Sequence, residues 1–374
     1  MIDKAVRPEV RSMVRPRHGG DVWQFGSIRD YSSNVNPLGP PQRLNDYIQE
    51  AAQGLSNYPD DSAADLKQAI ASRYDVRTEN VIVGAGSAEL IRLFPEVFVS
   101  PGDRVVMPRP TFSEYAFACQ LMGARMVDLP LAPESGFRLD MAVMLSALDG
   151  AKAVYLCNPN NPTSRMVGRK DLLEIVKEAE RRETMVFLDE TLLELSARDE
   201  ELSLVREVEG HSNLFIIRSF TKSFAMPGMR IGYGFGSKDV IRYMEAGRLT
   251  WNLGTIEQRV ATRLMNDEQD HVRRAVNLLE EEKERMRSRV SRLMCDDLLL
   301  PDSYFFFAPL AKLGVGSPDF RKAMLKHGVL VRDCTSFGRP CDAYTRFCVK
   351  TPTLDEEFLS ALTSAVEEIK EGRY

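Results

Sequence analysis

This 374-residue chain lacks three features that would place it in other protein classes: a long apolar run, an excess of basic residues and a secretory signal. No run of about 18 apolar residues occurs, so we expect no segment that spans a membrane. Lysine and arginine number 49 against 54 aspartate and glutamate, and this small acidic excess argues against nucleic acid or a membrane surface as a partner. The stretch from Met1 to Arg17 is polar and has no apolar core, so we expect no secretory signal.

Thiol and metal chemistry also have little support in the composition. The chain has six cysteines, and no two of them stand in a C-x-x-C arrangement. We therefore expect reduced thiols in a cytoplasmic protein, at Cys119, Cys157, Cys295, Cys334, Cys341 and Cys348. The histidines are scattered, and no metal site is expected at His18, His211, His271 or His327.

What the chain does contain is an alternation of short apolar runs with amphipathic helical patterns such as Asp171 to Arg182. The runs are Val81 to Val83, Val105 to Met107, Met126 to Leu129, Ala153 to Cys157, Met185 to Leu188, Leu214 to Ile217 and Ile231 to Phe235. This alternation predicts a three-layer α/β fold around a doubly wound, mainly parallel seven-stranded sheet. Both faces of such a sheet are covered, which explains why the runs are mostly apolar.

The two ends of the chain differ from this middle part. The first 41 residues are rich in proline and glycine, so we expect an extended arm there. A long helical pattern from Asp270 to Met294 is expected to connect two lobes. Strand patterns at Tyr304 to Ala308, Val329 to Val331 and Tyr344 to Val349, with helical patterns at Pro318 to His327 and Leu354 to Lys370, indicate a smaller α+β C-terminal domain. We expect an arm at 1–40, a large domain at 41–268 and a small domain at 269–374.

The segment after the run Leu214 to Ile217 carries the most specific chemical signal. It reads Ser219-Phe-Thr-Lys222-Ser-Phe-Ala-Met-Pro-Gly-Met-Arg230-Ile-Gly. A lysine at a strand end can form an imine with a cofactor aldehyde, and the neighbouring hydroxyls and Arg230 can hold a phosphate of that cofactor. The alternative is a solvated loop lysine, which is the usual state of this residue.

Other polar residues also follow predicted strands, where ligands of open α/β sheets bind. Gly84-Ala-Gly86-Ser87-Ala88-Glu89 follows one strand and opens a helix, whose free N–H groups suit an anion. It is neither a Walker loop nor a dinucleotide fingerprint, and a plain strand-to-helix turn is the alternative. Asp189 ends another strand, where it can serve a cofactor or cap a helix.

Together these motifs resemble the pyridoxal 5′-phosphate (PLP) enzymes of the aspartate aminotransferase fold. The resemblance implies PLP as cofactor, attached to Lys222, with Asp189 paired to the pyridine nitrogen so that the ring stays protonated and withdraws electrons. It also implies that the cofactor phosphate is held by residues of the two glycine-containing segments, namely Gly86, Ser87, Ala88, Ser219, Thr221 and Arg230.

Three further positions take their roles from this resemblance. Asn161 would hydrogen-bond the ring 3′-oxygen, and Phe112 would stack on the ring; from composition alone they read as a turn residue and a core residue. Tyr58 would reach the phosphate of the neighbouring subunit's cofactor, which implies a homodimer. One position departs from the pattern, because Leu192 stands three residues after Asp189 where many relatives have a tyrosine that bonds the 3′-oxygen. We therefore expect one donor fewer there.

Two arginines and the arm bear on the substrate. Arg332 and Arg346 belong to the C-terminal part, and such side chains can hold a carboxylate and a phosphate. Near one PLP, together with His18 and Asn34 of the arm, they suggest a doubly anionic substrate, a phosphorylated amino acid or amino alcohol that Asn161 would also line. The alternative is a surface arginine and a loop histidine.

The arm narrows the resemblance within the family. His18-Gly-Gly and Asn34-Val-Asn-Pro-Leu-Gly look like the L-threonine-O-3-phosphate decarboxylases, whereas histidinol-phosphate aminotransferases usually read Asn-Glu-Asn-Pro-Tyr-Gly and lack the His-Gly-Gly. The resemblance thus implies decarboxylation of L-threonine O-3-phosphate to (R)-1-aminopropan-2-yl phosphate in cobalamin biosynthesis. The alternatives are amino transfer from histidinol phosphate to 2-oxoglutarate in histidine biosynthesis and a non-catalytic binding protein of the same fold.

Overall fold

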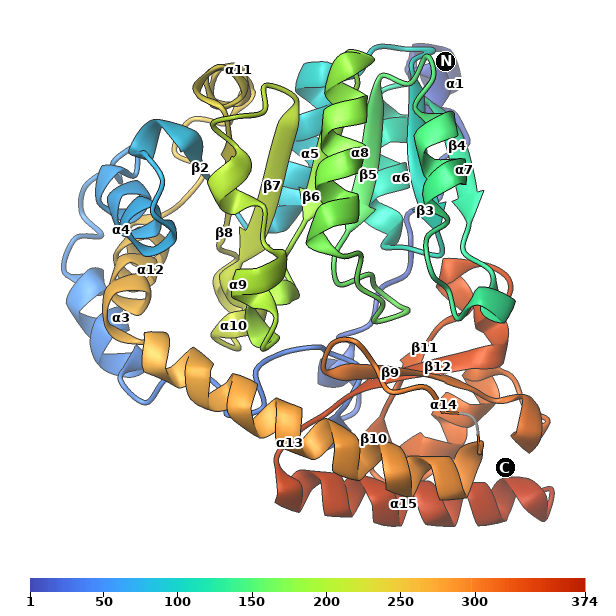
Figure 1. Cartoon of the computed structure of the whole chain (residues 1–374). Coiled ribbons are helices and arrows are strands. Elements are labelled where there is room, and N and C mark those ends of the chain that lie inside the picture. The colour runs from blue at the N-terminus through green and yellow to red at the C-terminus, as the bar shows by residue number, and fades with distance from the viewer. Residues whose placement is uncertain (297, 374) are drawn as a thin grey trace.

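A seven-stranded sheet in the order β2-β8-β7-β6-β5-β3-β4 dominates the computed structural model, which describes residues 1–296 and 298–373 (Figure 1). The strands are β2 (Val81–Gly84), β3 (Arg104–Arg109), β4 (Arg125–Pro130), β5 (Ala153–Cys157), β6 (Met185–Asp189), β7 (Leu214–Ser219) and β8 (Gly232–Gly236). Neighbouring strands are parallel except for β8, which runs antiparallel to β2 and β7. The predicted mainly parallel sheet is therefore confirmed.

The reversed direction of β8 follows from its connection to β7. The chain between them contains only two single turns of helix, α10 (Phe220–Ser223) and η6 (Pro227–Met229). A parallel return needs a crossover long enough to run back along the face of the sheet, usually through a full helix. The two short turns cannot span that length, so the chain re-enters the sheet from the same edge and runs antiparallel.

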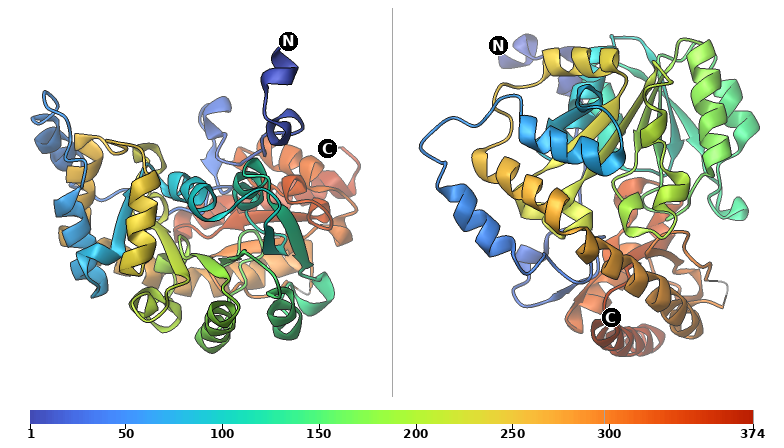
Figure 2. Two further views of the ribbon diagram at one scale, coloured as in Figure 1. Left: turned by 90° about the horizontal axis from the view of Figure 1, so that it is seen from above. Right: turned by 60° about the vertical axis from the view of Figure 1, so that its left-hand side comes forward.

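Helices cover both faces of the sheet (Figure 1, and Figure 2 from above). Besides α10, the helices of this large lobe are α3 (Leu44–Ala52), α4 (Ala64–Tyr74), α5 (Ser87–Phe98), α6 (Ser113–Leu121), α7 (Met141–Ala147), α8 (Arg169–Arg181), α9 (Asp199–Leu202), α11 (Lys238–Gly247) and α12 (Thr255–Asp267). Along β5, Ala153 and Tyr155 pack with α5, α6 and α11, while Val154 and Leu156 pack with α8 on the other face. Among the described residues, no helix is long and apolar enough to cross a membrane.

A smaller lobe follows α13 (Gln269–Met294), whose 26 residues extend about 39 Å from the large lobe into the small one (Figure 1). The antiparallel sheet of this lobe has the order β11-β12-β9 and consists of β9 (Phe305–Pro309), β11 (Arg332–Asp333) and β12 (Tyr344–Cys348). The other elements of the lobe are α14 (Ser317–Lys326), β10 (Val329–Leu330) and α15 (Pro352–Lys370). The strand predicted at Val329 to Val331 is confirmed as β10. After it the chain changes partner, because β10 pairs with the arm and β11 with β12. We keep 1–40, 41–268 and 269–374 as our proposed domain division.

The N-terminal arm is less extended than its proline content predicts. It contains two short helices, α1 (Ile2–Ala5) and α2 (Pro8–Arg11), and Pro8 occupies the first turn of α2, where its missing N–H costs nothing. Beside α2, the Arg7 guanidinium donates to the carbonyl of Leu121 at the end of α6 (2.6 Å). Further on, β1 (Arg29–Asp30) pairs in parallel with β10. The arm thus runs from the large lobe to the small lobe.

Candidate active site

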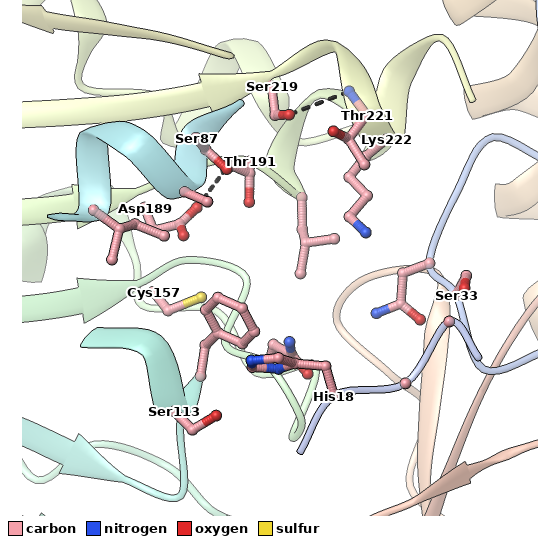
Figure 3. A pocket seen from close by; sticks show the side chains of 18 of the residues that line it. His18, Ser33, Ser87, Ser113, Cys157, Asp189, Thr191, Ser219, Thr221 and Lys222 are labelled. Atoms are coloured by element: carbon pink, nitrogen blue, oxygen red, sulfur yellow. Dashed lines mark hydrogen bonds between the residues drawn. The ribbon is translucent and has the colours of Figure 1, made fainter. Parts of the chain in front are cut away.

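A cavity of about 260 Å³ lies where the carboxyl ends of the parallel strands, the arm and the small lobe meet (Figure 3). Most of the predicted site residues line it: His18, Asn34, Ser87, Ala88, Phe112, Asn161, Asp189, Ser219, Thr221, Lys222, Arg230, Arg332 and Arg346. Of the other two predicted residues, Gly86 directly precedes Ser87 in the chain, and Tyr58 lines a different pocket. Residues that are 328 positions apart in sequence, from His18 to Arg346, therefore share one pocket.

Lys222 occupies the single turn α10 directly after β7, and its amine points into the cavity (Figure 3). Ser219 caps this turn, because its hydroxyl accepts from the backbone N–H of Thr221 (3.2 Å). Burial and the charge of Arg346 lower the pKa of Lys222 to about 8, against the opposing attraction of Asp189. Near neutral pH a useful fraction of this amine is neutral, and a neutral amine is the form that attacks an aldehyde.

Asp189 ends β6 with only 4% of its surface exposed. One carboxylate oxygen accepts from the Tyr115 hydroxyl (2.5 Å) and the other from the backbone N–H of Thr191 (2.8 Å). Burial raises the pKa of Asp189, although these donors favour its charged form. Sequence reasoning gave Tyr115 no role; its spacing of three from Phe112 at the start of α6 was the available signal, since residues three apart share a helix face.

The turn from β2 into α5 forms a cradle that only glycine allows. Gly86 has φ +76°, and a Cβ atom there would overlap the guanidinium of Arg230. A Cβ atom on Gly232 would overlap the backbone of Ser87 at the first turn of α5. Backbone N–H groups at a helix start, together with Arg230, suit a phosphate, so the residues present fit the phosphate end of PLP.

Arg332 and Arg346 lie directly opposite each other on β11 and β12 and are 8% and 6% exposed. Arg332 donates to the carbonyl of Arg17 (3.0 Å) and the Ser336 hydroxyl (2.7 Å), and Arg346 donates to the side chain of Asn161 and the carbonyl of Ser32. Among the described residues, no carboxylate forms an ion pair with either guanidinium.

This arrangement leaves two buried like charges uncompensated. Burial lowers the pKa of Arg332, and burial together with Arg332 lowers the pKa of Arg346 to about 10. Within the described part of the chain, Nε of Arg346 and Oδ1 of Asn34 are buried without a hydrogen-bond partner. Buried charges and polar atoms are normally paired, so these groups indicate a site for a polar, anionic ligand.

The arm places His18 at the mouth of the cavity. Its Nε2 lies 2.5 Å from Oε1 of Glu114 on α6, and its ring packs near Phe112 with centroids 5.4 Å apart. The absence of a side chain on Gly19 lets the arm lie against Arg332, because a Cβ there would be only 3.1 Å from Cδ of that arginine. Glu114 was also missed by sequence reasoning, since nothing in the local pattern connects it with the arm.

Two further expectations from the sequence concern Leu192 and Tyr58. Leu192 lines the cavity with an apolar side chain, so it offers no donor at the position where a tyrosine was noted to be usual. Tyr58 is 79% exposed, and its ring stacks on Trp251 with centroids 4.4 Å apart, away from the cavity of its own chain. Its role toward a neighbouring subunit stays a prediction.

Cys119, Cys157, Cys334, Cys341 and Cys348 form no disulfide with another described residue. Reduced thiols stay a prediction for the six cysteines. Five of them are buried, and Cys157 at the end of β5 lines the cavity. Burial raises the pKa of Cys157, so its thiol stays protonated at neutral pH. No cluster of metal-ligating side chains occurs within residues 1–296 and 298–373.

Comparison with known proteins agrees with this geometry. The family model for aminotransferase class I and II matches residues 29–362. A relative from Caldanaerobacter subterraneus subsp. tengcongensis, whose name as a threonine-phosphate decarboxylase is itself provisional, is 34% identical over 362 residues and 96% of each chain. A histidinol-phosphate aminotransferase from Moorella thermoacetica is 33% identical over 88% of this chain and 83% of its own.

The fold also matches that of a solved enzyme structure that contains PLP. The structure of histidinol-phosphate aminotransferase from Sinorhizobium meliloti in complex with PLP has a TM-score of 0.84 and 22% identity, covering 97% of this chain and 98% of that one. The seven-stranded sheet, the smaller lobe and the family match all lead to one assignment. The chain belongs to the aminotransferase class I and II family of PLP-dependent enzymes.

Proposed function

We propose that this enzyme releases the carboxyl group of L-threonine O-3-phosphate as carbon dioxide and leaves (R)-1-aminopropan-2-yl phosphate, a step in cobalamin biosynthesis. The observation that carries the proposal is the pair of arginines, Arg332 and Arg346, which line the cavity, face each other and have no acidic partner among the described residues. The similarity to the Caldanaerobacter relative supports it.

The argument from the arginines is electrostatic. An unpaired buried charge costs several kcal/mol, and like charges directly opposite on neighbouring strands repel. A ligand with two anionic groups relieves both guanidiniums at once. Threonine phosphate carries a carboxylate and a phosphate, whereas histidinol phosphate carries only the phosphate. The pair therefore suits threonine phosphate better than histidinol phosphate as the amino substrate, although glutamate and 2-oxoglutarate, the second substrates of amino transfer, also carry two anionic groups.

The cavity fits PLP, and its proposed holders are Lys222 for covalent attachment, Asp189 for the pyridine nitrogen, Gly86, Ser87, Ala88, Ser219, Thr221 and Arg230 for the phosphate, Phe112 for the ring face and Asn161 for the 3′-oxygen. When bound, PLP withdraws electrons from Cα of the amino substrate, so that one bond there can break. Asp189 holds a proton at the ring nitrogen, and its own two hydrogen-bond donors keep the carboxylate oriented.

Groups of the chain decide which bond at Cα breaks. In the proposed arrangement Arg346 holds the substrate carboxylate, while Arg332 and His18 hold the phosphate, so the substrate is fixed at both ends. The Lys222 amine has a pKa of about 8 and is therefore available in both protonation states near neutral pH. After carbon dioxide has left, Lys222 returns a proton to Cα.

Histidinol-phosphate aminotransferase is the second candidate, and a specific observation favours it. Several relatives at about a third identity carry that name, among them the Moorella protein. In that reaction Lys222 would remove a proton from Cα, and the two arginines would bind the carboxylates of glutamate or 2-oxoglutarate. A non-catalytic role is disfavoured by the lowered pKa of Lys222, which a mere binding protein does not need.

We also propose a homodimer in which Tyr58 contributes to the partner's site. Tyr58 and Trp251 form an exposed aromatic pair, 79% and 48% accessible in the single chain. Exposed aromatic rings of this kind are enriched at protein interfaces. Sedimentation of the protein, with Tyr58→Ala as the comparison, tests this point separately from the chemistry.

The reaction is tested by supplying PLP-loaded enzyme with O-phospho-L-threonine and measuring carbon dioxide and the amine product. L-Threonine serves as the control without phosphate, and Lys222→Ala as the control without attachment. Amino transfer from histidinol phosphate to 2-oxoglutarate, with no gas released, would replace the decarboxylase by the aminotransferase. A protein that develops no visible absorption with PLP would support the non-catalytic alternative.

A further inference from the structure

Glu114 lies at the mouth of the cavity and has no part in the function proposed above. It stands in the first turn of α6, two residues after Phe112, and its Oε1 is 2.5 Å from Nε2 of His18. The two side chains come from elements 96 residues apart in sequence, the arm and the large lobe. Their contact therefore joins the arm to the large lobe beside the substrate site.

The backbone on both sides of His18 is held by the small lobe. The carbonyl of Arg17 accepts from Arg332 (3.0 Å), Gly19 packs against the same arginine, and Asp21 pairs with Arg321 (2.8 Å). These contacts position the His18 main chain next to Arg332, but they do not set the rotation of the imidazole. The ring itself is held by Glu114 through the hydrogen bond and by its packing near Phe112.

The chemistry of the pair fixes which nitrogen faces the ligand. A carboxylate only accepts hydrogen bonds, so Nε2 of His18 carries the hydrogen and donates it to Glu114. Nδ1 is the ring nitrogen left for a ligand, and it can donate to a phosphate when the ring carries a second hydrogen there. A histidine held in this way by a carboxylate resembles the orienting pairs that fix imidazoles in many enzyme sites.

We infer that Glu114 is a positioning residue, which orients His18 toward the phosphate of the substrate and so contributes to the preference for phosphorylated amino compounds. The inference rests on the proposed function insofar as the substrate carries a phosphate. It does not depend on which bond at Cα breaks, because the phosphate end is common to both candidate reactions.

A simpler account is an ordinary surface ion pair, since the side chains of His18 and Glu114 are 36% and 26% exposed. Such pairs contribute little to stability, and an acidic residue in a first helical turn also favours the helix dipole. Asp239→Ala is the matched control for the interaction of an acid with the helix dipole, because Asp239 is an exposed acid in the first turn of α11, away from the cavity. Neither account gives Glu114 an influence on ligand binding through His18.

The test is a double-mutant cycle on the binding of n-propyl phosphate to PLP-loaded enzyme, measured by calorimetry. This probe has a phosphate but no amino group, so it cannot react. We expect His18→Ala and Glu114→Ala each to raise the Kd about 10-fold, or about 1.4 kcal/mol. The double variant should be no weaker than the weaker single variant, and Asp239→Ala should bind like the wild type. Glu114→Gln should retain most of the affinity, because its amide oxygen still accepts from His18.

The sign of the Glu114 effect separates orientation from plain electrostatics. Removing an acid from the mouth of an anion site should tighten binding if charge alone matters. Tighter binding in Glu114→Ala, unchanged binding, or effects that multiply in the double variant would each overturn the inference, as would a wild type that does not bind the probe. The proposed decarboxylation fails instead in the carbon dioxide assay, so the two failures are distinguishable.

Discussion

Replacing Arg346 with methionine should abolish binding of O-phospho-L-threonine, the proposed substrate, without destabilising the ligand-free protein. Burial and Arg332 lower the pKa of Arg346 to about 10, which corresponds to about 3 kcal/mol against its charged form. Because the pKa is lowered, the folded state holds this proton less tightly than the unfolded state does. The charge therefore costs stability at neutral pH, and this cost begins to shrink only when the pH exceeds about 10 and vanishes near the ordinary pKa of arginine.

Two hydrogen bonds offset most of this cost. Arg346 donates to the side chain of Asn161 and to the carbonyl of Ser32, and each such bond from a charged donor contributes about 1.5 kcal/mol. Methionine fills a similar volume with a flexible apolar chain. We therefore expect the free energy of unfolding of Arg346→Met to lie within about 1 kcal/mol of the wild-type value.

Arg218→Met is the matched control, with a much larger expected loss of stability. Arg218 is 1% exposed, and its guanidinium pairs with Glu190 (2.7 Å) and Asp199 (2.6 Å). Its removal leaves acidic groups without a partner in the interior and should lower the free energy of unfolding by about 3–5 kcal/mol. The change in unfolding free energy on substitution with methionine thus distinguishes an arginine that pairs with buried acids from one that has no acidic partner.

The assay is urea unfolding of PLP-free protein, followed by circular dichroism in a buffer without phosphate or sulfate. With PLP bound, O-phospho-L-threonine should then raise the melting temperature of the wild type but not that of Arg346→Met, since only a protein that binds the ligand is stabilised by it. If Arg346→Met loses as much stability as Arg218→Met, the arginine pair is not an uncompensated charge, and the electrostatic argument for the substrate is refuted.

Three further predictions concern PLP binding. Tyr115→Phe should raise the Kd for PLP about 10-fold or more, since the buried carboxylate at the end of β6 loses a donor; an equal effect of the neighbouring Tyr155→Phe, whose hydroxyl does not bond that carboxylate, would contradict this. The rate of PLP attachment to Lys222, followed by absorbance, should rise with pH through about 8 and then level off, because the neutral amine attacks; a rate still rising at about pH 10 would show an ordinary lysine. Gly86→Ala should weaken PLP binding because the added methyl overlaps a guanidinium, whereas Gly314→Ala, also at positive φ but with open space around it, should leave PLP affinity unchanged.

The sheet and the residues at its strand ends could be predicted because their signals are local. An apolar run of four to six residues that ends in Asp189 or precedes Lys222 is readable in one stretch of sequence. Parallel strands place their carboxyl ends at one edge, so strand-end residues far apart in sequence must converge. The cavity contains both of these residues for that reason.

The side chains that support this edge could not be predicted in the same way. Tyr115 reaches Asp189 across 74 residues, and Glu114 reaches His18 across 96. Each contact depends on how α6 packs and where the arm crosses, which are tertiary facts without a local pattern. The helix α2 in the arm was missed for a different reason, since proline density suggested extension while Pro8 in fact starts a helical turn.

One contact connects the position of the two lobes with the choice of reaction. Arg346 belongs to β12 of the small lobe, and Asn161 follows β5 of the large lobe, yet their side chains are hydrogen-bonded. If Arg346 holds the substrate carboxylate, then the place of that carboxylate relative to Lys222 is set by how the lobes meet. The bond at Cα that breaks depends on this orientation. The packing of the two lobes is therefore one physical means by which this cavity can favour decarboxylation or amino transfer.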